Sequence, residues 1–410
     1  MKRVTNVFIC FIVTITTVFG FNVNEVAAAN GLKVHFINVG GADSILIECN
    51  GEVALIDGGY ATNAMRYTDE SLLGIVDQTI SKKLSNTTNK DALMEELKLV
   101  LTEHPENDVV NYLKKQGITK IDLLISTHPH QDHVSGLLSV LCNFKVSNIV
   151  MSSYKYDTSY AQFFDALVQE MATNKTANVV VPNEGDTFKI GGDNGAIFKN
   201  LTNPADTYNT GDSGNDVNNY SLVMRMDYGK RSFLLTGDVQ RAAQAKLLQK
   251  YSKEINVDIL KQPHHGYSNM DEGYQNPMNS GNYDFTKVVD ADLTVISCDD
   301  ITPTQKVLND AAHSNVYTTY SLGDIVMSCD GKKVDIQYKD STVYAFYTGD
   351  INGDGKITPT DYVQVRRQLL GTMNLTGFAR TSADVNGDGS VTPSDYVLIR
   401  RHLLGTYTIQ

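Results

Sequence analysis

The densest group of chemically reactive side chains is the segment His128-Pro129-His130-Gln131-Asp132-His133. It directly follows Ile121–Ser126, an apolar run typical of a buried strand, so we expect it on the loop that leaves this strand. Alternate side chains of an extended segment point the same way, which would bring together His128, His130 and Asp132. Imidazole and carboxylate groups are the ligands expected for zinc and other transition metals.

Two further polar clusters follow predicted strands. Thr236-Gly237-Asp238 places a carboxylate at the end of one strand, and Pro263-His264-His265-Gly266 follows another at 258–260. Five of the nine histidines lie in this last turn or in the segment at 128–133, a concentration that is unusual for histidines that only fill surface or core. The clusters together predict one metal site at an edge of a sheet.

The elements that must position these residues are mostly strands. The predicted strands and helices are Val34–Val39, Ser44–Glu48, Glu52–Asp57, Asp108–Gly117 (helix), Ser221–Asp227, Arg231–Thr236 and Gln240–Tyr251 (helix). Strands that alternate with helices and include hairpins indicate an α/β sandwich instead of a parallel barrel. Residues 60–105, with a helical stretch near 91–102, are expected to form an insertion over this scaffold.

Composition narrows the function further. The chain has 410 residues, which favours two or three domains, and a formal net charge of −12, which excludes a broad basic surface for nucleic acid. It has 0 Trp and 21 Tyr, so an aromatic carbohydrate platform would have to be built of tyrosine. With 5 cysteines it is not a disulfide scaffold, and whether Cys49, Cys142, Cys298 and Cys329 pair stays open.

The N-terminus predicts secretion. Lys2 and Arg3 precede an apolar run at 7–21, and small residues follow at 27–29. We interpret residues 1–29 as a signal peptide cleaved after Ala29; a membrane anchor is the alternative, but the run contains threonines and is shorter than the ~20 apolar residues of a span. We therefore expect a secreted monomer without a membrane span.

In residues 32–345 the chain resembles the metallo-β-lactamase superfamily, most closely the branch found with bacterial DNA-uptake channels and secreted phosphodiesterases. The motifs that carry this resemblance are Val34–Ser44, Leu55-Ile56-Asp57-Gly58-Gly59, the 128–133 segment, Leu235-Thr236-Gly237-Asp238 and His264-His265-Gly266. The resemblance implies an αββα sandwich over residues 30–346 and a two-metal hydrolase site. It implies that His128 and His130 bind one metal, that Asp132 and His133 bind the other, and that Asp238 bridges both. We expect His265 to complete the second metal, with His264 as the alternative.

One departure from this family concerns the first metal. Relatives with a full ligand set have another histidine just before the strand that leads to the bridging aspartate, whereas residues 215–222 contain none. We expect this metal to be weakly held, completed by Asn218, Asp216 or water, and to be zinc or manganese. The DNA-uptake branch tends to have asparagine here, which argues against a β-lactamase.

Metals at such a site would lower the pKa of a bound water and polarise a phosphoryl or carbonyl oxygen. We expect Asp132 and Asp238 to be catalytic, with Asp132 orienting or deprotonating the water. Other polar residues have structural interpretations: Asp57 caps a turn behind the site, Asp43 is structural, and three further histidines are solvated or satisfied by local partners, namely His35, His104 and His313.

After Tyr347 the sequence becomes a tandem repeat, with almost no linker, so we expect the two parts to pack together. Residues 350–361 follow the EF-hand loop pattern, with oxygen ligands at positions 1, 3, 5, 9 and 12, a position-7 carbonyl and glycine at position 6, and the pattern recurs 34 residues later. The predicted calcium ligands are Asp350, Asn352, Asp354, Lys356 (carbonyl), Thr358 and Asp361 in the first loop, and Asp384, Asn386, Asp388, Ser390 (carbonyl), Thr392 and Asp395 in the second.

Duplicated loops with Asp at position 12 and one helix after each loop closely resemble a type I dockerin, here assigned to 347–410. The resemblance implies two structural Ca²⁺ ions and binding to a cohesin module of a scaffold protein. The expected cohesin-binding residues are Pro359, Thr360, Arg366, Arg367, Pro393, Ser394, Arg400 and Arg401. The near-identity of the repeats implies that either one could face the cohesin.

Together these features predict a secreted metal-dependent hydrolase attached to a cellulosome-type scaffold. A phosphodiesterase acting on nucleic acid or on a choline- or teichoate-type phosphodiester is the preferred interpretation. A lactone, ester or amide hydrolase of the same fold is one alternative, and a catalytically decayed binding module is another.

Overall fold

The structure is a computed structural model. It describes residues 31–60, 95, 98–99, 101–102, 107–208, 217–267, 285–300 and 305–409. The expected signal peptide, most of the expected 60–105 insertion, His104 and Asp216 lie outside the described residues. Within the described part of the chain, no helix is both long enough and apolar enough to cross a bilayer.

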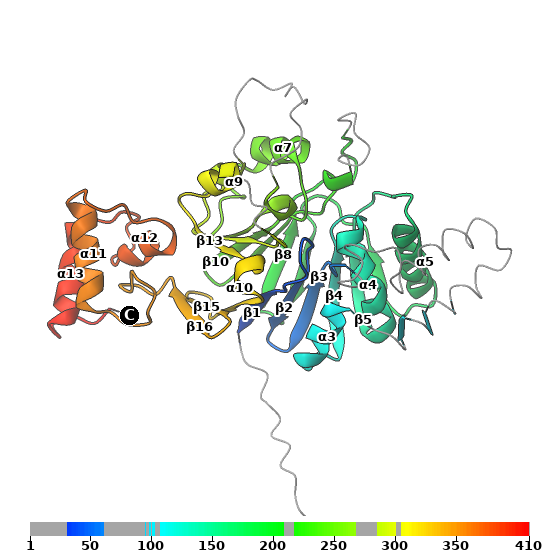
Figure 1. Cartoon of the computed structure of the whole chain (residues 1–410), viewed down its shortest axis with the longest axis horizontal. Coiled ribbons are helices and arrows are strands. Elements are labelled where there is room, and N and C mark those ends of the chain that lie inside the picture. Colours follow the sequence, from blue (N-terminus) through cyan, green and yellow to red (C-terminus); the bar gives the residue numbers. More distant parts are fainter. Residues whose placement is uncertain are drawn as a thin grey trace, which may run out of the picture.

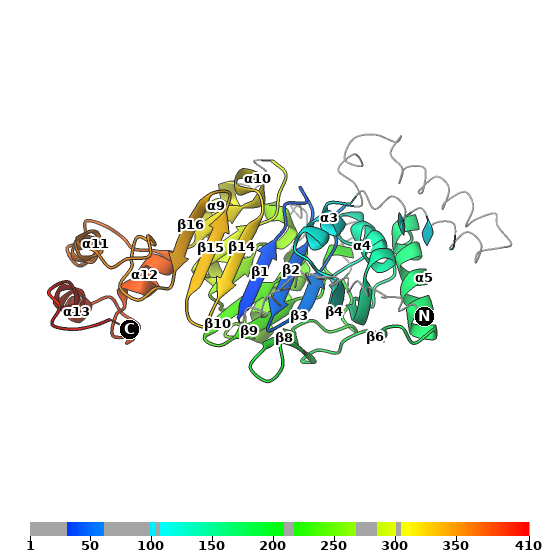
Figure 2. The same ribbon diagram turned by 90° about the horizontal axis from the view of Figure 1, so that it is seen from below.

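A nine-stranded mixed sheet forms one layer of the fold. Its order is β16-β15-β14-β1-β2-β3-β4-β5-β6, and Figure 2 shows these strands side by side. The strands are β1 (Leu32–Phe36), β2 (Ile45–Cys49), β3 (Glu52–Ile56), β4 (Lys120–Ser126), β5 (Lys145–Met151), β6 (Asn178–Val180), β14 (Ile325–Cys329), β15 (Val334–Tyr338) and β16 (Ser341–Ala345). Strands β3, β4, β5 and β6 are parallel, so the carboxyl ends of β3 and β4 meet at one edge.

A second sheet of seven strands packs against the first, in the order β13-β12-β11-β10-β9-β8-β7. Its strands are β7 (Thr187–Ile190), β8 (Ala196–Asn200), β9 (Met224–Tyr228), β10 (Arg231–Leu235), β11 (Ile259–Lys261), β12 (Leu293–Ile296) and β13 (Asn315–Thr318). The predicted hairpin is present as β9 and β10, and strands β10 to β13 are parallel. Phe36 and Phe233 lie in the core between the two sheets and are fully buried.

Helices cover the outer faces of both sheets, which completes the predicted αββα sandwich (Figure 1). α3 (Asp108–Lys115), α4 (Gln131–Asn143) and α5 (Ser159–Thr173) pack on the nine-stranded sheet. On the seven-stranded sheet lie α7 (Arg241–Tyr251), α8 (Phe285–Val289) and α9 (Gln305–Asp310), and a short α10 (Thr319–Leu322) follows β13. The expected helices at 108–117 and 240–251 correspond to α3 and α7. The four cysteines left open above are unpaired.

The C-terminal repeat forms a small helical unit beyond β16 (Figure 1). Its helices are α11 (Pro359–Leu369), α12 (Gly377–Ala383) and α13 (Pro393–Leu403). α11 and α13 each begin with the same capping box, in which a threonine and the aspartate three residues later exchange hydrogen bonds with each other's backbone. The sequence predicted α11 and α13 but not α12.

α12 joins the repeat to the sandwich, in accord with the expectation that the two parts pack together. The Gly377 amide donates to the His313 carbonyl at 2.7 Å, and the Thr381 hydroxyl donates to Asp292 at 2.7 Å. Phe378 enters the core between the two sheets and is 5 % exposed. Only glycine fits at 377, because a Cβ there would lie 2.1 Å from Asn315 Oδ1 and φ is +55°. We call these contacts the clasp.

Candidate metal centre

The histidine-rich segment directly follows β4, as predicted, but only its first part is a loop. Asp132 and His133 lie in the first turn of α4, so the expected extended alternation does not hold, and Asp132 groups with His133 instead of with His128 and His130. The start of α4 lies against the end of β3 through two backbone hydrogen bonds, from Gly58 N to His133 O at 2.8 Å and from Gly136 N to Gly59 O at 3.0 Å. A Cβ at Gly136 would lie 1.8 Å from the Gly58 carbonyl oxygen, and a Cβ at Gly58 would lie 2.4 Å from Leu137 N. Glycine at both positions therefore lets the helix approach the strand closely enough to set the loop.

Four of the predicted ligands form one compact cluster. Asp132, His133, Asp238 and His265 each offer a ligand atom, all within 4.8 Å of one another. His133 Nε2 lies 3.4 Å from Asp132 Oδ2 and 3.1 Å from Asp238 Oδ2, and His265 Nε2 lies 3.1 and 3.2 Å from the same two oxygens. Atoms that bind a tetrahedral ion at about 2.0–2.1 Å lie roughly 3.3 Å apart. The spacing of these donors therefore fits a single divalent ion, which we call the second centre.

A second pair of donors lies beside this cluster. His128 Nε2 is 3.1 Å from His130 Nδ1 and 3.9 Å from Asp238 Oδ2. Asp238 therefore faces both groups, and its Oδ1 is buried without a hydrogen-bond partner among the described residues. A buried carboxylate whose Oδ2 approaches donors of both groups, and whose Oδ1 is unpaired, offers the atoms that a bridging ligand needs. We call the His128–His130 side the first centre.

Buried partners fix the orientation of the histidine rings. His133 Nδ1 donates to Asp57 Oδ2 at 2.8 Å, and Asp57 also accepts hydrogen bonds from the Thr127 amide and hydroxyl at 2.8 and 2.7 Å. Asp57 lies behind the site as expected, but it supports His133 through its carboxylate and does not merely cap a turn. Such partners hold a metal-binding imidazole in the correct tautomer and orientation.

His128 is held by two hydroxyl groups, of Thr127 at 3.1 Å and Ser221 at 3.2 Å from its Nδ1. Both hydroxyls already donate elsewhere, to Asp57 and to the Asn218 carbonyl, so they accept from His128 Nδ1–H. The lone pair of His128 is then on Nε2, which faces the site. Ser221 was not among the residues singled out from the sequence, because an isolated serine carries no local signal.

His265 has similar support. His265 Nδ1 lies 3.1 Å from the Ser297 carbonyl oxygen and 3.6 Å from Asp43 Oδ1. Asp43 forms a fully buried ion pair with Lys261, the last residue of β11. Asp43 thus has the structural role expected from the sequence, and it lies directly behind the site.

The pKa values of the histidines differ between the two centres. Burial raises the pKa of Asp132 and Asp238, but the charges of His133 and His265 outweigh it and hold both pKa values well below the ordinary range. Burial lowers the pKa of His265, but Asp238 and Asp132 raise it to about 10. Without a metal, the two carboxylates therefore favour the protonated form of His265.

Burial also lowers the pKa values of the remaining site histidines, His128, His130 and His264. These imidazoles are neutral at pH 7, which is the form that binds a metal. Nitrogen and oxygen donors of this kind suit zinc or manganese. The site thus has the donor chemistry for divalent metal.

Other predicted residues lie away from the centre. His35 is buried in β1, where it contacts Tyr112 Oη at 2.8 Å and Glu48 at 3.1 Å, so it is satisfied locally. His313 is exposed, and its carbonyl forms part of the clasp.

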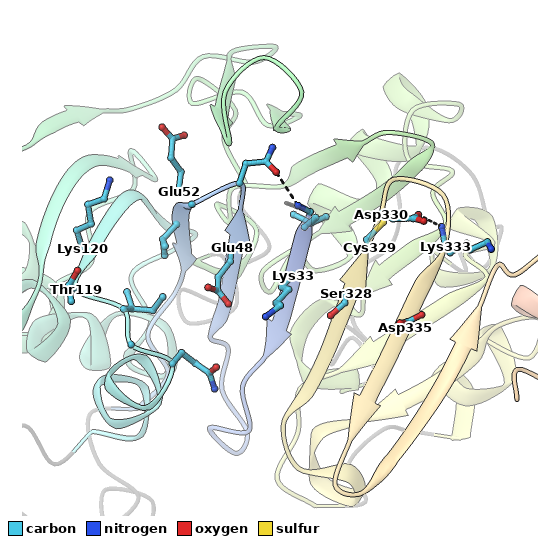
Figure 3. Close-up of a pocket in the computed structure, with 18 of the residues that line it drawn as sticks. Lys33, Glu48, Glu52, Thr119, Lys120, Ser328, Cys329, Asp330, Lys333 and Asp335 are labelled. Atoms are coloured by element: carbon cyan, nitrogen blue, oxygen red, sulfur yellow. Dashed lines mark hydrogen bonds between the residues drawn. The ribbon is translucent and has the colours of Figure 1, made fainter. Parts of the chain in front are cut away.

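A cavity of about 600 Å³ lies at the opposite end of the nine-stranded sheet, where β1 begins and the hairpins β2–β3 and β14–β15 turn (Figure 3). Its lining mixes Lys33, Lys120 and Lys333 with Glu48 and Asp335. It contains none of the predicted metal ligands.

The two predicted calcium loops have the same internal geometry. Asp350 accepts hydrogen bonds from the amides of Gly353 and Gly355 at 2.9 and 2.7 Å, and Asp384 accepts the equivalent bonds at 3.0 and 2.7 Å. Burial and the nearby Asp361 raise the pKa of Asp350, because carboxylates crowd together there. Crowded oxygen donors of this kind fit Ca²⁺. All eight predicted cohesin-binding residues are exposed.

Comparison with known proteins agrees with these features. Residues 37–272 match the metallo-beta-lactamase superfamily, and residues 348–404 match the dockerin type I domain. Over 168 residues the chain is 27% identical to ComE operon protein 3 of Bacillus subtilis (strain 168), covering 40% of this chain and 20% of that protein. The chain is also 41% identical over 54 residues to the uncharacterized protein YcaI of Escherichia coli (strain K12), covering 13% of this chain and 7% of that protein. The chain thus matches a fifth or less of the length of these relatives.

Solved structures with a similar fold include the metallo hydrolase Igni18 from Ignicoccus hospitalis KIN4/I, which is 13% identical with a TM-score of 0.37 and covers 72% of this chain and 98% of that one. A diphosphatase from the PhnP family is 12% identical with a TM-score of 0.36, covering 73% and 98%. The match to ComE operon protein 3 supports the branch expected from the sequence. With the superfamily match spanning more than half of its length, the chain belongs to the metallo-β-lactamase superfamily, and it carries a type I dockerin at its C-terminus.

Proposed function

We propose that this chain is a secreted two-metal phosphodiesterase that its dockerin attaches to a cohesin-bearing scaffold. The observation that carries the catalytic part is Asp238, a buried carboxylate shared by two adjacent groups of donors. Two metals held about 3.5–4 Å apart suit in-line displacement at phosphorus, because one can stabilise the attacking oxygen and the other the leaving oxygen. The bound metals would supply hydroxide at neutral pH and neutralise charge on the phosphoryl group.

The protein's own side chains have separate roles in this proposal. His128, His130 and Asp238 hold the first centre, and Asp132, His133, Asp238 and His265 hold the second. Asp132 is 19 % exposed, whereas His133 and Asp238 are almost completely buried. It is therefore the carboxylate of this cluster that an incoming water can reach, and we assign it the task of orienting or deprotonating that water.

Two tyrosines lie beside the histidines and provide a surface for an organic group next to the phosphodiester. The Tyr156 ring lies 5.3 Å from the His130 ring, and the Tyr267 ring lies 6.3 Å from that of His265. Tyr267 is 37% exposed, so part of its side chain faces solvent next to the site. The acidic charge of the chain favours small or single-ended phosphodiesters over long duplex DNA.

Attachment rests on the dockerin. Its exposed repeat surfaces and its two loops for Ca²⁺ support binding to a cohesin, and the N-terminal segment supports export. Titration of type I cohesin modules against the full chain, with Ca²⁺ and with a chelator, tests the attachment. Binding that does not depend on calcium would contradict it.

The catalytic proposal is tested by hydrolysis of bis(p-nitrophenyl) phosphate after loading the protein with zinc or with manganese. Asp132→Asn should abolish turnover because it removes both a ligand and the proposed base. Asp193→Asn is the matched control, since Asp193 is a fully exposed surface carboxylate. No turnover by the loaded protein would refute phosphodiesterase activity, and activity on lactones or esters would then identify the alternative hydrolase.

A further inference from the structure

The nine-stranded sheet ends at β16, and beyond this strand the chain continues directly into the calcium repeat (Figure 2). An edge strand presents unpaired backbone N–H and C=O groups, which proteins commonly cover with a loop or a helix. At β16 the cover is the first calcium loop (350–361), because the Tyr344 amide donates to the Gly353 carbonyl oxygen at 3.0 Å. A loop built to hold calcium therefore supplies a hydrogen bond to the edge of the hydrolase sheet.

The first calcium loop also packs closely on the side chains of β16. A Cβ at Gly353 would lie 3.1 Å from Val343 Cγ1 and 3.0 Å from the Phe378 ring. A Cβ at Gly355 would lie 2.9 Å from the Tyr344 ring. Both glycines have positive φ, 72° and 84°, so glycine provides both the bend of the loop and its close approach to the strand.

The second calcium loop (384–395) has equivalent glycines without these contacts. Gly387 and Gly389 have φ of 72° and 89°, yet a Cβ at either position would meet no described atom within 4 Å. Gly353 is buried, whereas Gly387 is exposed. Two loops with nearly the same sequence and backbone therefore differ in their surroundings, since the first is packed against the sandwich and the second faces solvent.

The short segment between β16 and the first calcium loop is held at both ends. Phe346 lies in the core between the two sheets and is 5 % exposed. The Gly349 amide donates to the Ser382 carbonyl oxygen at 2.8 Å, and the Asp350 amide donates to the Tyr347 carbonyl oxygen at 3.0 Å. Asp350 is the first predicted calcium ligand, so the order of the loop and the position of β16 are linked through a few fixed residues.

We propose that the calcium ion of the first loop is a structural ion of the hydrolase sheet as well as of the dockerin, and that the ion of the second loop is not. A bound cation offsets the repulsion among the carboxylates of Asp350, Asp354 and Asp361 and so holds the loop in one conformation. The ordered loop then keeps the Gly353 carbonyl on the Tyr344 amide and covers the edge of β16. This inference goes beyond the proposed function, because it requires neither catalysis nor a cohesin.

Hydrogen exchange of the Tyr344 amide tests this in the full chain, with residues resolved by fragmentation mass spectrometry at a series of free Ca²⁺ concentrations. If the edge opens only after the first ion leaves, the exchange rate falls in proportion to 1 + [Ca²⁺]/Kd. Raising Ca²⁺ to about 100 times Kd should therefore slow the exchange of this amide by about 100-fold. A wild-type rate that does not change with calcium would overturn the inference.

Asp354→Ala and Asp388→Ala are matched variants, because each removes the position-5 ligand of one loop and both side chains are exposed. Asp354→Ala should abolish the calcium dependence of Tyr344 exchange, whereas Asp388→Ala should keep it. Exchange in α11 and α13 shows whether each variant keeps the dockerin folded. Calcium dependence that survives in Asp354→Ala, or that is lost in a folded Asp388→Ala protein, would overturn the inference.

Gly353→Ala and Gly387→Ala are a second pair that leaves all predicted calcium ligands in place. The two positions have the same φ of 72°, so the backbone penalty of alanine is the same in both. The added methyl group meets β16 and α12 at 353 but no described atom at 387, so Gly353→Ala alone should speed Tyr344 exchange in saturating Ca²⁺, by about 5-fold or more. Equal exchange rates in the two variants would show that the first loop does not cover the edge.

Discussion

The clasp predicts that part of the hydrolase domain's stability comes from a dockerin side chain. The perturbation is Phe378→Ala, which removes an aromatic ring that belongs to α12 but lies in the core between the two sheets. Substitution of a buried phenylalanine by alanine costs about 3–5 kcal/mol. We take the lower end, about 3 kcal/mol, because Phe378 lies at the margin of this core, where the ring also touches the first calcium loop at Gly353.

An unfolding entropy of about 2.1 cal/mol/K per residue over roughly 315 residues means that 1 kcal/mol shifts Tm by about 1.5 °C, so we expect the hydrolase transition to fall by roughly 4–5 °C. Differential scanning calorimetry of the full chain in saturating Ca²⁺ measures this, and repeating it with a chelator identifies the calcium-dependent dockerin transition. Ile399→Ala is the matched control, because Ile399 is fully buried within the dockerin's own core.

Ile399→Ala should lower only the dockerin transition, whereas Phe378→Ala should lower the hydrolase transition as well. A hydrolase transition that stays within about 1 °C of wild type in Phe378→Ala would refute the reasoning, since it would show that the clasp contributes no stability across the boundary.

Three substitutions around the metal centre have definite expected outcomes. Asp57→Asn should reduce metal affinity by about 10–100-fold in a competition titration, because His133 Nδ1 loses the carboxylate that accepts its hydrogen bond. Unchanged affinity would contradict this role. Gly136→Ala should lower Tm and metal content together, since the added Cβ would meet the Gly58 carbonyl oxygen at 1.8 Å. Lys261→Met should destabilise the protein in urea unfolding by about 3–5 kcal/mol by leaving Asp43 charged and unpaired, and adding Asp43→Asn should restore much of the loss. A double variant no more stable than the single one would contradict the pairing.

Much of the candidate site could be predicted because its signals are local. An apolar run followed at once by His128-x-His130-x-Asp132-His133 indicates a strand and a metal-binding loop without knowledge of any distant residue. The calcium loops are local in the same sense, since each has its ligands within twelve consecutive residues. The ends of the strands were predicted less accurately. The strand expected at 34–39 ends at Phe36, because Ile37 onward forms a loop closed by a hydrogen bond from Ile37 N to Ser44 O.

The supporting residues could not be predicted, because their partners are far away in the sequence. Ser221 contacts His128 across 93 residues, and Asp57 contacts His133 across 76. α12 was missed for a related reason. Its short sequence, Gly377–Ala383, has a weak helical pattern by itself, and its apolar contacts are divided: Phe378 packs in the core of the sandwich, whereas Ala379 and Ala383 pack in the core of the repeat.

The sequence by itself therefore determined the kinds of donor atoms, the strands and loops that carry them, and the presence of two calcium loops, since each depends on residues close together in the chain. The tertiary structure decided which donors meet. Asp238 lies between two groups of histidines only because the carboxyl ends of β4, β10 and β11 come together between two packed sheets. Similarly, the left-handed backbone at 264 and 265 separates two adjacent histidines, and this conformation is stable only where the surrounding side chains hold it in place.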